Sequence, residues 1–243
     1  MDPAEHLTYL RADIERMLAV PDEAYGNDVA NCPGWMVKEL LEHVAGVYTF
    51  ATQNLAADPG AELLVDVSLP EGVEGRALLE SSAGALLDQL EDVDPSEHRP
   101  NWAGVPTAEF YFRRMAQESA VHRWDAQLAV GDPEPIPAEQ AVDGVDELFE
   151  VFLGPWAKAR GIIGDGESVH LHATDADDVE GGEWTLTFVP EGVEVDRIHG
   201  KAQMAARGSA SDLLLFSWNR RPVELDVFGE PDLLAWWPSR VTI

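Results

Sequence analysis

The chain has 243 residues, 45% of them hydrophobic, which is enough apolar material for one large core or two smaller ones. Its 16 Lys and Arg residues against 45 Asp and Glu residues give a net charge of -29. This charge repels phosphates and anionic lipid head groups, and so argues against nucleic-acid and membrane partners. The single cysteine, Cys32, excludes an internal disulfide and a cysteine-based zinc cluster.

Targeting signals are not apparent in the sequence. It does not begin with a charged-then-apolar signal segment, and no apolar run approaches the roughly 20 residues of a membrane helix. A single free cysteine also suits a reducing compartment. We therefore expect a monomeric, cytoplasmic protein.

The first part of the chain predicts amphipathic helices, because apolar residues recur there at spacings of three and four. Three such stretches cover residues 7–17, 37–48 and 78–90. A fourth helix is predicted from a Thr107 cap to about residue 131, and a fifth over residues 138–158. Four long helices of this kind predict a four-helix bundle, from which the fifth helix leads away.

The part after residue 160 predicts strands, because apolar and polar residues alternate there. The alternating segments are SVHLHAT at 168–174, EWTLTFV at 183–189, VEVDRI at 193–198 and VELDVF at 223–228. Short helices are predicted in GSASDLLLFSWNRRP, where Ser209 and Asp212 resemble a capping box, and in EPDLLAWW. We therefore expect an α+β domain after the bundle.

The fourth predicted helix carries two polar residues on the stripe that should face the core. Tyr111 and Met115 begin this stripe, and steps of three or four residues lead to Glu118 and His122. In the second helix, His43 falls on the apolar face in the same way. An ionised carboxylate in such a core is costly unless a cation lies beside it.

A divalent metal ion would satisfy all three polar side chains. Glu118 and His122 are four residues apart and lie one above the other, and His43 could approach from the neighbouring helix. Two imidazoles and one carboxylate give zinc three ligands and leave a fourth position open, as in catalytic sites. Hydrogen-bonded core histidines would give the same pattern, and the spacing alone does not decide between the two readings.

Several longer segments resemble a known family. CPGWMVKELLEHVAGV at 32–47 is similar to the second-helix segment of the mycothiol-dependent maleylpyruvate isomerase family, and QESAVHRWDAQ at 117–127 is similar to its metal-binding helix. The resemblance continues through VHLHATD, EWTLTF and GSASDLLLFSWNRRP, so it covers nearly the whole chain. It implies an α+β two-domain fold, with a DinB-like metal-binding four-helix bundle at 1–158 and a small α+β domain at 159–243.

The resemblance also implies the chemistry. His43, Glu118 and His122 would bind zinc or another divalent metal, and mycothiol, the actinobacterial counterpart of glutathione, would be the thiol cofactor. A zinc-bound thiolate would attack a small electrophilic substrate, in a maleylpyruvate isomerase-like cis–trans isomerase or in a mycothiol S-transferase.

An arginine near the C-terminus completes what the resemblance implies. Arg220 matches the arginine that the family's C-terminal domain contributes to the active site, and it would bind a substrate carboxylate, with Arg221 as the neighbouring alternative. The family more often has glycine where this chain has Asn219.

Other functions stay open. Two histidines and one carboxylate are also typical of non-haem iron enzymes and of zinc hydrolases, which need no thiol. A non-catalytic binding module would have a structural metal or none. His170 and His172 share one strand face and could bind a metal together, but they are expected at the solvent face or the domain interface. Cys32 is expected to pack rather than act as a nucleophile. Arg123 and Asp125 are expected to point to other faces of the helix, where an internal ion pair would explain them, and Asp125 could also be a partner of a metal ligand.

Overall fold

The structure is a computed structural model that describes residues 1–131, 133–176, 179 and 181–242. Its internal contacts divide the chain into two compact units, Met1–Glu134 and Pro135–Ile243. The first unit is helical, and the second combines a mixed sheet with helices, which confirms the predicted α+β two-domain fold class. None of the described helices is both long enough and apolar enough to span a membrane.

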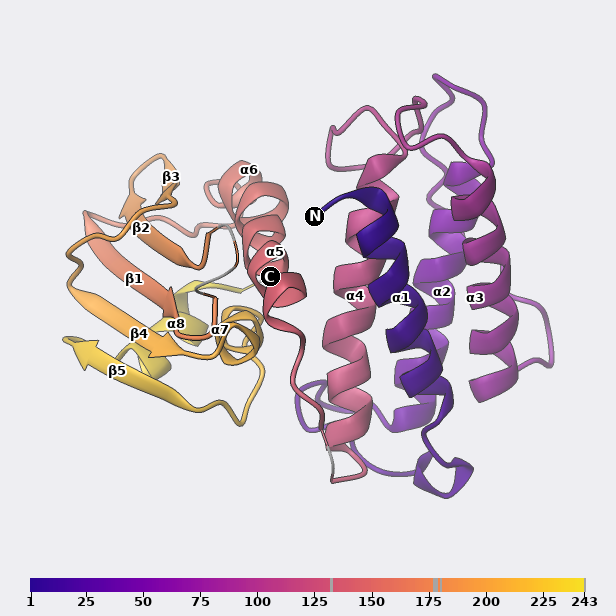
Figure 1. The fold of residues 1–243 in the computed structure, drawn as a ribbon, viewed down its shortest axis with the longest axis horizontal. Coiled ribbons are helices and arrows are strands. Elements are labelled where there is room, and N and C mark those ends of the chain that lie inside the picture. Colours follow the sequence, from indigo (N-terminus) through magenta and orange to yellow (C-terminus); the bar gives the residue numbers. More distant parts are fainter. Residues whose placement is uncertain (132, 177–178, 180, 243) are drawn as a thin grey trace. The chain divides into compact units, whose positions relative to one another are not determined.

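The first unit is a bundle of long helices (Figure 1). Its elements are α1 Pro3–Leu18, a short 3-10 turn η1 Asp22–Ala24, α2 Val37–Leu55, α3 Gly75–Asp92 and α4 Glu109–Leu128. Helix α2 packs against α3 and α4, and α1 packs against α4. The apolar stripes predicted from the spacing meet in the core, where Leu10, Leu40, Leu79 and Tyr111 are completely buried.

Local interactions determine where the helices begin. At α1, the Asp2 carboxylate accepts from the Glu5 N–H at 2.9 Å, while the Glu5 carboxylate accepts from the Asp2 N–H at 2.6 Å, which is a complete capping box. Helix α4 begins after Ala108 without a side-chain cap, so the predicted Thr107 cap is wrong. The Ala108 N–H donates instead to the backbone carbonyl of Glu97 at 2.8 Å, which satisfies this group without a capping side chain.

A buried ion pair joins α1 to α4. Arg123 Nε lies 3.0 Å from Asp13 Oδ1, and the two side chains are only 1% and 2% exposed. The guanidinium also donates to Gln127 Oε1 at 2.9 Å, and Arg16 approaches the same Asp13 oxygen at 3.8 Å. The internal ion pair expected for Arg123 is therefore formed with Asp13 of α1.

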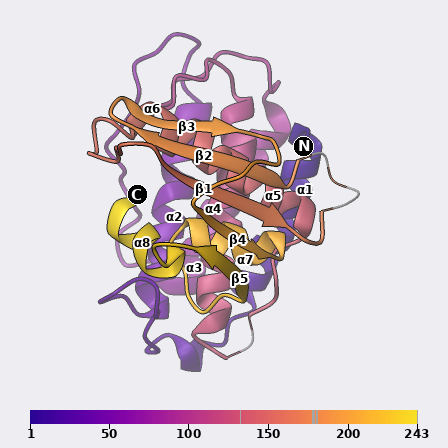
Figure 2. The ribbon, with the colours of Figure 1, turned by 90° about the vertical axis from the view of Figure 1, so that its left-hand side faces the viewer.

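The second unit is built on a five-stranded sheet (Figure 2). Its strands are β1 Glu167–Ala173, β2 Glu183–Val189, β3 Gly192–Asp196, β4 Met204–Gly208 and β5 Leu225–Gly229. Their order across the sheet is β3-β2-β1-β4-β5, in which β1 and β4 are parallel and the other neighbours are antiparallel. The inward side chains Trp184, Leu186 and Phe188 of β2 are buried, as the alternation predicts.

Helices cover the sheet on the side of these buried side chains. They are α7 Ala210–Ser217 and α8 Leu233–Arg240, which contact strands directly, and α5 Ala138–Glu147, which packs against α7. A π-helical turn, η2 Leu148–Leu153, and α6 Gly154–Trp156 continue α5. The start of α7 matches its prediction, because the Ser209 hydroxyl accepts from the Asp212 N–H at 3.0 Å.

Two features of the second unit differ from the sequence predictions. Helix α5 packs against α7, and the internal contacts divide the units after Glu134, whereas the sequence predicts a first domain that extends to residue 158. Strand β4 was not predicted, because its sequence MAARG contains two alanines and a glycine, which have little strand preference. Pairing with β1 and β5 supplies what the local sequence lacks.

Candidate metal site

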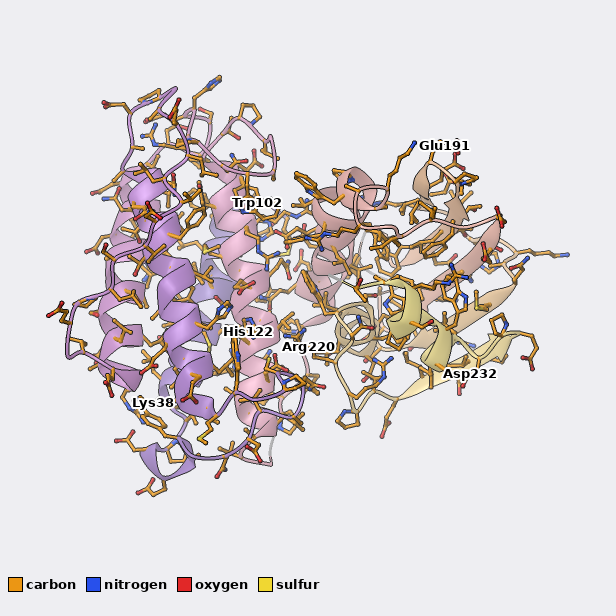
Figure 3. The ribbon with its side chains drawn as sticks, turned by 180° about the vertical axis from the view of Figure 1, so that it is seen from behind. Lys38, Trp102, His122, Glu191, Arg220 and Asp232 are labelled. Atoms are coloured by element: carbon orange, nitrogen blue, oxygen red, sulfur yellow. The ribbon has the colours of Figure 1, made fainter. Side chains whose placement is uncertain are left out.

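Three candidate ligands lie together inside the helical unit. His43 comes from α2, while Glu118 and His122, the latter labelled in Figure 3, come from successive turns of α4. Glu118 Oε1 lies 3.2 Å from His43 Nε2 and also 3.2 Å from His122 Nε2. All three donor atoms are within 4.8 Å of one another. The structure thus brings together the three residues that the sequence singled out.

The donor set fits a divalent metal ion such as zinc. Zinc binds imidazole nitrogen and carboxylate oxygen at about 2.0–2.2 Å, so tetrahedral donors stand about 3.4 Å apart. The separations of 3.2 Å around Glu118 are already close to that spacing. Three protein donors leave a further position for a small molecule. The side chains of His43 and Glu118 are 36% and 19% exposed, so solvent reaches this group.

Asp125 determines how the His122 ring is oriented. Its Oδ2 lies 3.2 Å from His122 Nδ1, so that Nδ1–H donates to the carboxylate and Nε2 faces Glu118. A neutral ring in this orientation would direct a lone pair at Glu118 Oε1, and the contact therefore needs a proton or a metal ion between the two atoms. Burial opposes the imidazolium, but Glu118 and Asp125 outweigh burial and raise the pKa of His122 to about 9.

Arg114 and Trp35 surround the ligands. Arg114, one turn before Glu118, is buried and donates from Nη2 to Glu118 Oε2 at 2.9 Å. Burial penalises the carboxylate, but His122, His43 and Arg114 together hold the pKa of Glu118 well below its usual value. The Trp35 ring lies 4.9 Å from the His43 ring and forms a wall of the site. Arg114 is a site residue that was not predicted from the sequence, although its spacing of four residues from Glu118 is a usable signal.

Cys32 lies beside the site rather than among the three donors. Its Sγ is 3.9 Å from Asp125 Oδ2, and Asn31 Nδ2 is 3.4 Å from Asp125 Oδ1. The sulfur, the carboxylate and His122 form another close group of donor atoms, but the hydrogen bond between Asp125 and His122 occupies this side of the ring. Cys32 therefore stays a residue that we expect to pack rather than to act as a nucleophile.

Comparisons with known proteins cover both units. The family model for the mycothiol maleylpyruvate isomerase N-terminal domain matches residues 7–127, and the model for the MDMPI C-terminal domain matches residues 139–235. The chain belongs to the mycothiol maleylpyruvate isomerase family. A search of curated proteins finds no match to its sequence.

Solved structures share the fold of this family member. A crystal structure of the mycothiol-dependent maleylpyruvate isomerase is 18% identical in sequence, with a TM-score of 0.61 and 93% of each chain covered. The structure of a histidine-to-alanine mutant of the mycothiol-dependent maleylpyruvate isomerase is 17% identical, with a TM-score of 0.62 and the same coverage. At this identity the likeness shows a common fold, so the function has to be argued from the residues of this chain.

Arg220 of this family member follows Trp218, the C-cap of α7, and Asn219 in the second unit (Figure 3). Asn219 has a φ of 60°, and the N–H of Arg220 donates back to the Leu215 carbonyl at 2.7 Å, which closes the helix end. Asparagine tolerates this left-handed conformation, so the turn forms without the glycine more usual in the family. The guanidinium of Arg221 lies over the Phe216 ring, 5.0 Å from its centre.

Replacing Asp125 by asparagine in this family member should weaken metal binding by about 10–100-fold, because the substitution removes the charge that orients His122. For the same reason, the pKa of His122 in the metal-free protein should fall below about 9. Zinc titration measures the first effect, and the pH dependence of the His122 ring signals in NMR spectra measures the second. An unchanged affinity together with an unchanged pKa would show that Asp125 does not orient the ring.

Proposed function

We propose that this chain is a cytoplasmic, mycothiol-dependent zinc enzyme that acts on a small electrophile as a maleylpyruvate isomerase-like cis–trans isomerase. The observation that carries the proposal is the open group of three donors formed by His43, Glu118 and His122. Membership of the family supports the choice of thiol. Zinc bound by these donors would lower the pKa of a coordinated thiol and supply the thiolate nucleophile.

The chain's own residues prepare the site for this chemistry. Asp125 fixes the His122 ring so that Nε2 is directed at Glu118. Arg114 holds Glu118 Oε2, which leaves Oε1 as the oxygen nearest both imidazoles. The Trp35 ring packs beside His43, with the two ring centres 4.9 Å apart. Each ligand is thus held in position before a metal ion or a thiol arrives.

Arg220 is proposed to bind a carboxylate of the substrate. A chain with a net charge of -29 repels anions, so an anionic substrate needs a local cation. A guanidinium can bind a carboxylate with two parallel hydrogen bonds. The Arg221 guanidinium lies over the Phe216 ring, and the Arg220 guanidinium donates to the Trp218 carbonyl at 3.0 Å. We choose Arg220 of the two because it matches the arginine of the family's C-terminal domain.

Replacing Arg220 by glutamine is expected to raise the KM for a carboxylate substrate by about 10–100-fold, because charge-assisted hydrogen bonds contribute roughly 1.5–3 kcal/mol. The metal content should stay unchanged, since Arg220 is not among the proposed ligands. Steady-state kinetics with maleylpyruvate measure the effect, and Arg221→Gln is the matched control. Equal losses in the two variants would contradict a specific role for Arg220.

The proposed function is tested by incubating the purified protein with mycothiol and maleylpyruvate while following both the isomer formed and the free thiol. An isomerase forms product with the thiol concentration constant, whereas an S-transferase consumes one thiol for each substrate molecule. Chelation of the metal should stop either reaction. Turnover that needs no thiol would contradict the proposal and would indicate a hydrolase or a non-haem iron enzyme, which elemental analysis of the bound metal separates.

A further inference from the structure

A second cluster of histidines lies in the sheet of the second unit. His170 and His172 are on β1, Glu183 is on β2 and pairs with His172 across the ladder, and His199 follows β3. Because side chains alternate along a strand, these two β1 histidines lie on the face opposite to Val169 and Leu171, which are buried in the core. The cluster is therefore on the side of the sheet away from its apolar core.

His170 is buried, whereas a residue on the solvent face of the sheet would be exposed. It is only 7% exposed, whereas the side chain of His172 is 33% exposed. The segment after β3 covers this part of the sheet, because the Thr185 hydroxyl donates to the Ile198 carbonyl at 3.0 Å and a side chain at Gly200 would clash with the same hydroxyl. This segment brings the His199 ring to 5.0 Å from the His170 ring.

One carboxylate stands at the centre of the cluster. Glu183 Oε2 lies 2.9 Å from His199 Nδ1 and 3.5 Å from His170 Nε2. The other oxygen, Oε1, lies 3.6 Å from His172 Nε2. The donor atoms of His170, Glu183 and His199 are all within 4.8 Å of one another. These separations bracket the spacing of about 3.4 Å between donors around a tetrahedral zinc ion.

His170 supplies an independent indication that something binds here. Its Nε2 is buried and has no hydrogen-bond partner among the described residues. The 3.5 Å approach to Glu183 is too long for a good hydrogen bond. An orphaned polar atom at such depth costs free energy, and a cation placed between His170 and Glu183 would remove this cost.

We propose that His170, Glu183 and His199 bind a divalent transition-metal ion such as zinc, and that His172 positions Glu183 through its second oxygen. Imidazole and carboxylate donors are suited to zinc, cobalt and nickel rather than to calcium or magnesium. Charges of both signs lie nearby. In the strand ladder, Asp196 of β3 is opposite Thr185 of β2, and Arg207 of β4 is opposite His172 of β1. The ion would tie the segment after β3 to β1 and β2, and it would be separate from the site in the first unit.

The test uses the full chain in a background that lacks the first candidate site. A His43→Ala, His122→Ala double variant, stripped of metal with a chelator, is titrated with zinc by calorimetry. The proposal predicts that about one equivalent still binds and raises the Tm. Adding His199→Ala should abolish this binding, and because that side chain is 74% exposed, the substitution leaves the core intact. Glu183→Gln should also abolish it, while His98→Ala, an exposed histidine in the first unit, should leave it unchanged.

Two results would overturn the proposal. One is the absence of stoichiometric zinc binding in the double-variant background. The other is binding that persists unchanged in both His199→Ala and Glu183→Gln, which would indicate scattered surface histidines. NMR signals of the His170 ring report on the site directly. They should shift when zinc is added to the double variant, but not when zinc is added to the triple variant that also carries His199→Ala. Since the background already lacks the first site, none of these outcomes depends on the proposed thiol chemistry.

Discussion

His122→Ala is expected to remove one equivalent of bound metal and to abolish thiol-dependent turnover. The substitution deletes one of three donors and leaves Asp125 without its imidazole partner. Mutating a residue that only hydrogen-bonds a metal ligand typically lowers metal affinity by up to roughly 100-fold. Loss of the ligand His122 itself should lower the affinity of this site by more than that. The bundle should still fold, because the apolar side chains that α2 and α4 bury, such as Leu40 and Tyr111, are unchanged.

Elemental analysis and turnover with mycothiol measure the effect of His122→Ala. The matched control is His98→Ala, which removes an exposed histidine from the same unit and should change neither quantity. Glu118→Gln should resemble His122→Ala, because the amide carries no charge to balance the metal ion. Full metal content and full activity in His122→Ala would refute the assignment of this site.

Arg123→Met is expected to have the largest effect on folding stability. The change removes the cation that faces Asp13, and leaving one charge of a buried pair uncompensated costs about 3–5 kcal/mol. Arg123 also donates hydrogen bonds to Gln127 and to the Glu134 carbonyl, and these are lost as well. Arg16, 3.8 Å from Asp13, is more exposed and can replace only part of this interaction.

Urea denaturation measures the free energy of unfolding of the Arg123→Met variant. The double variant Asp13→Leu, Arg123→Met should recover most of the loss, because no unpaired charge is then buried. Asp13→Leu alone should be destabilising, since it strands the guanidinium instead. A loss below about 1 kcal/mol for Arg123→Met would mean that water or Arg16 compensates Asp13, as at an exposed ion pair.

Regular periodicity in the sequence predicted most of the helices and strands. Spacings of three and four located the four bundle helices, and the same reasoning identified Glu118 and His122 as polar residues on a buried stripe. Alternation located β1 and β2, whose inward residues form a continuous apolar row. These signals are strong because burial against a neighbouring element imposes them directly on the sequence.

Features that depend on distant partners were harder to predict. The start of α4 uses the carbonyl of Glu97 rather than Thr107, and Arg123 pairs with Asp13, 110 residues away. Strand β4 forms because β1 and β5 flank it, although its alanines favour helix. The orphaned nitrogen of His170 results from the segment after β3, whose path no local pattern encodes.

The contacts around the first candidate site were predictable only in part. Spacing on one helix predicts Glu118 and His122. Their orientation depends on the partners of the atoms that face away from the site, which are Arg114 for Glu118 Oε2 and Asp125 for His122 Nδ1. The sequence indicates Asp125, three residues after His122, as such a neighbour, and a spacing of four residues links Arg114 to Glu118 in the same way. Whether a given polar residue turns toward the site or toward another helix depends on the packing of the whole bundle.

The order of strands in the sheet bears on how the protein behaves at high concentration. Strands β3 and β5 lie at the two ends of the sheet, where exposed backbone groups could pair with the same strand of another molecule. Exposed Glu194 and Asp196 on β3 and Asp226 on β5 place carboxylates along these edges. Together with the net charge of -29, they oppose edge-to-edge aggregation, and high salt, which screens such repulsion, should weaken that protection.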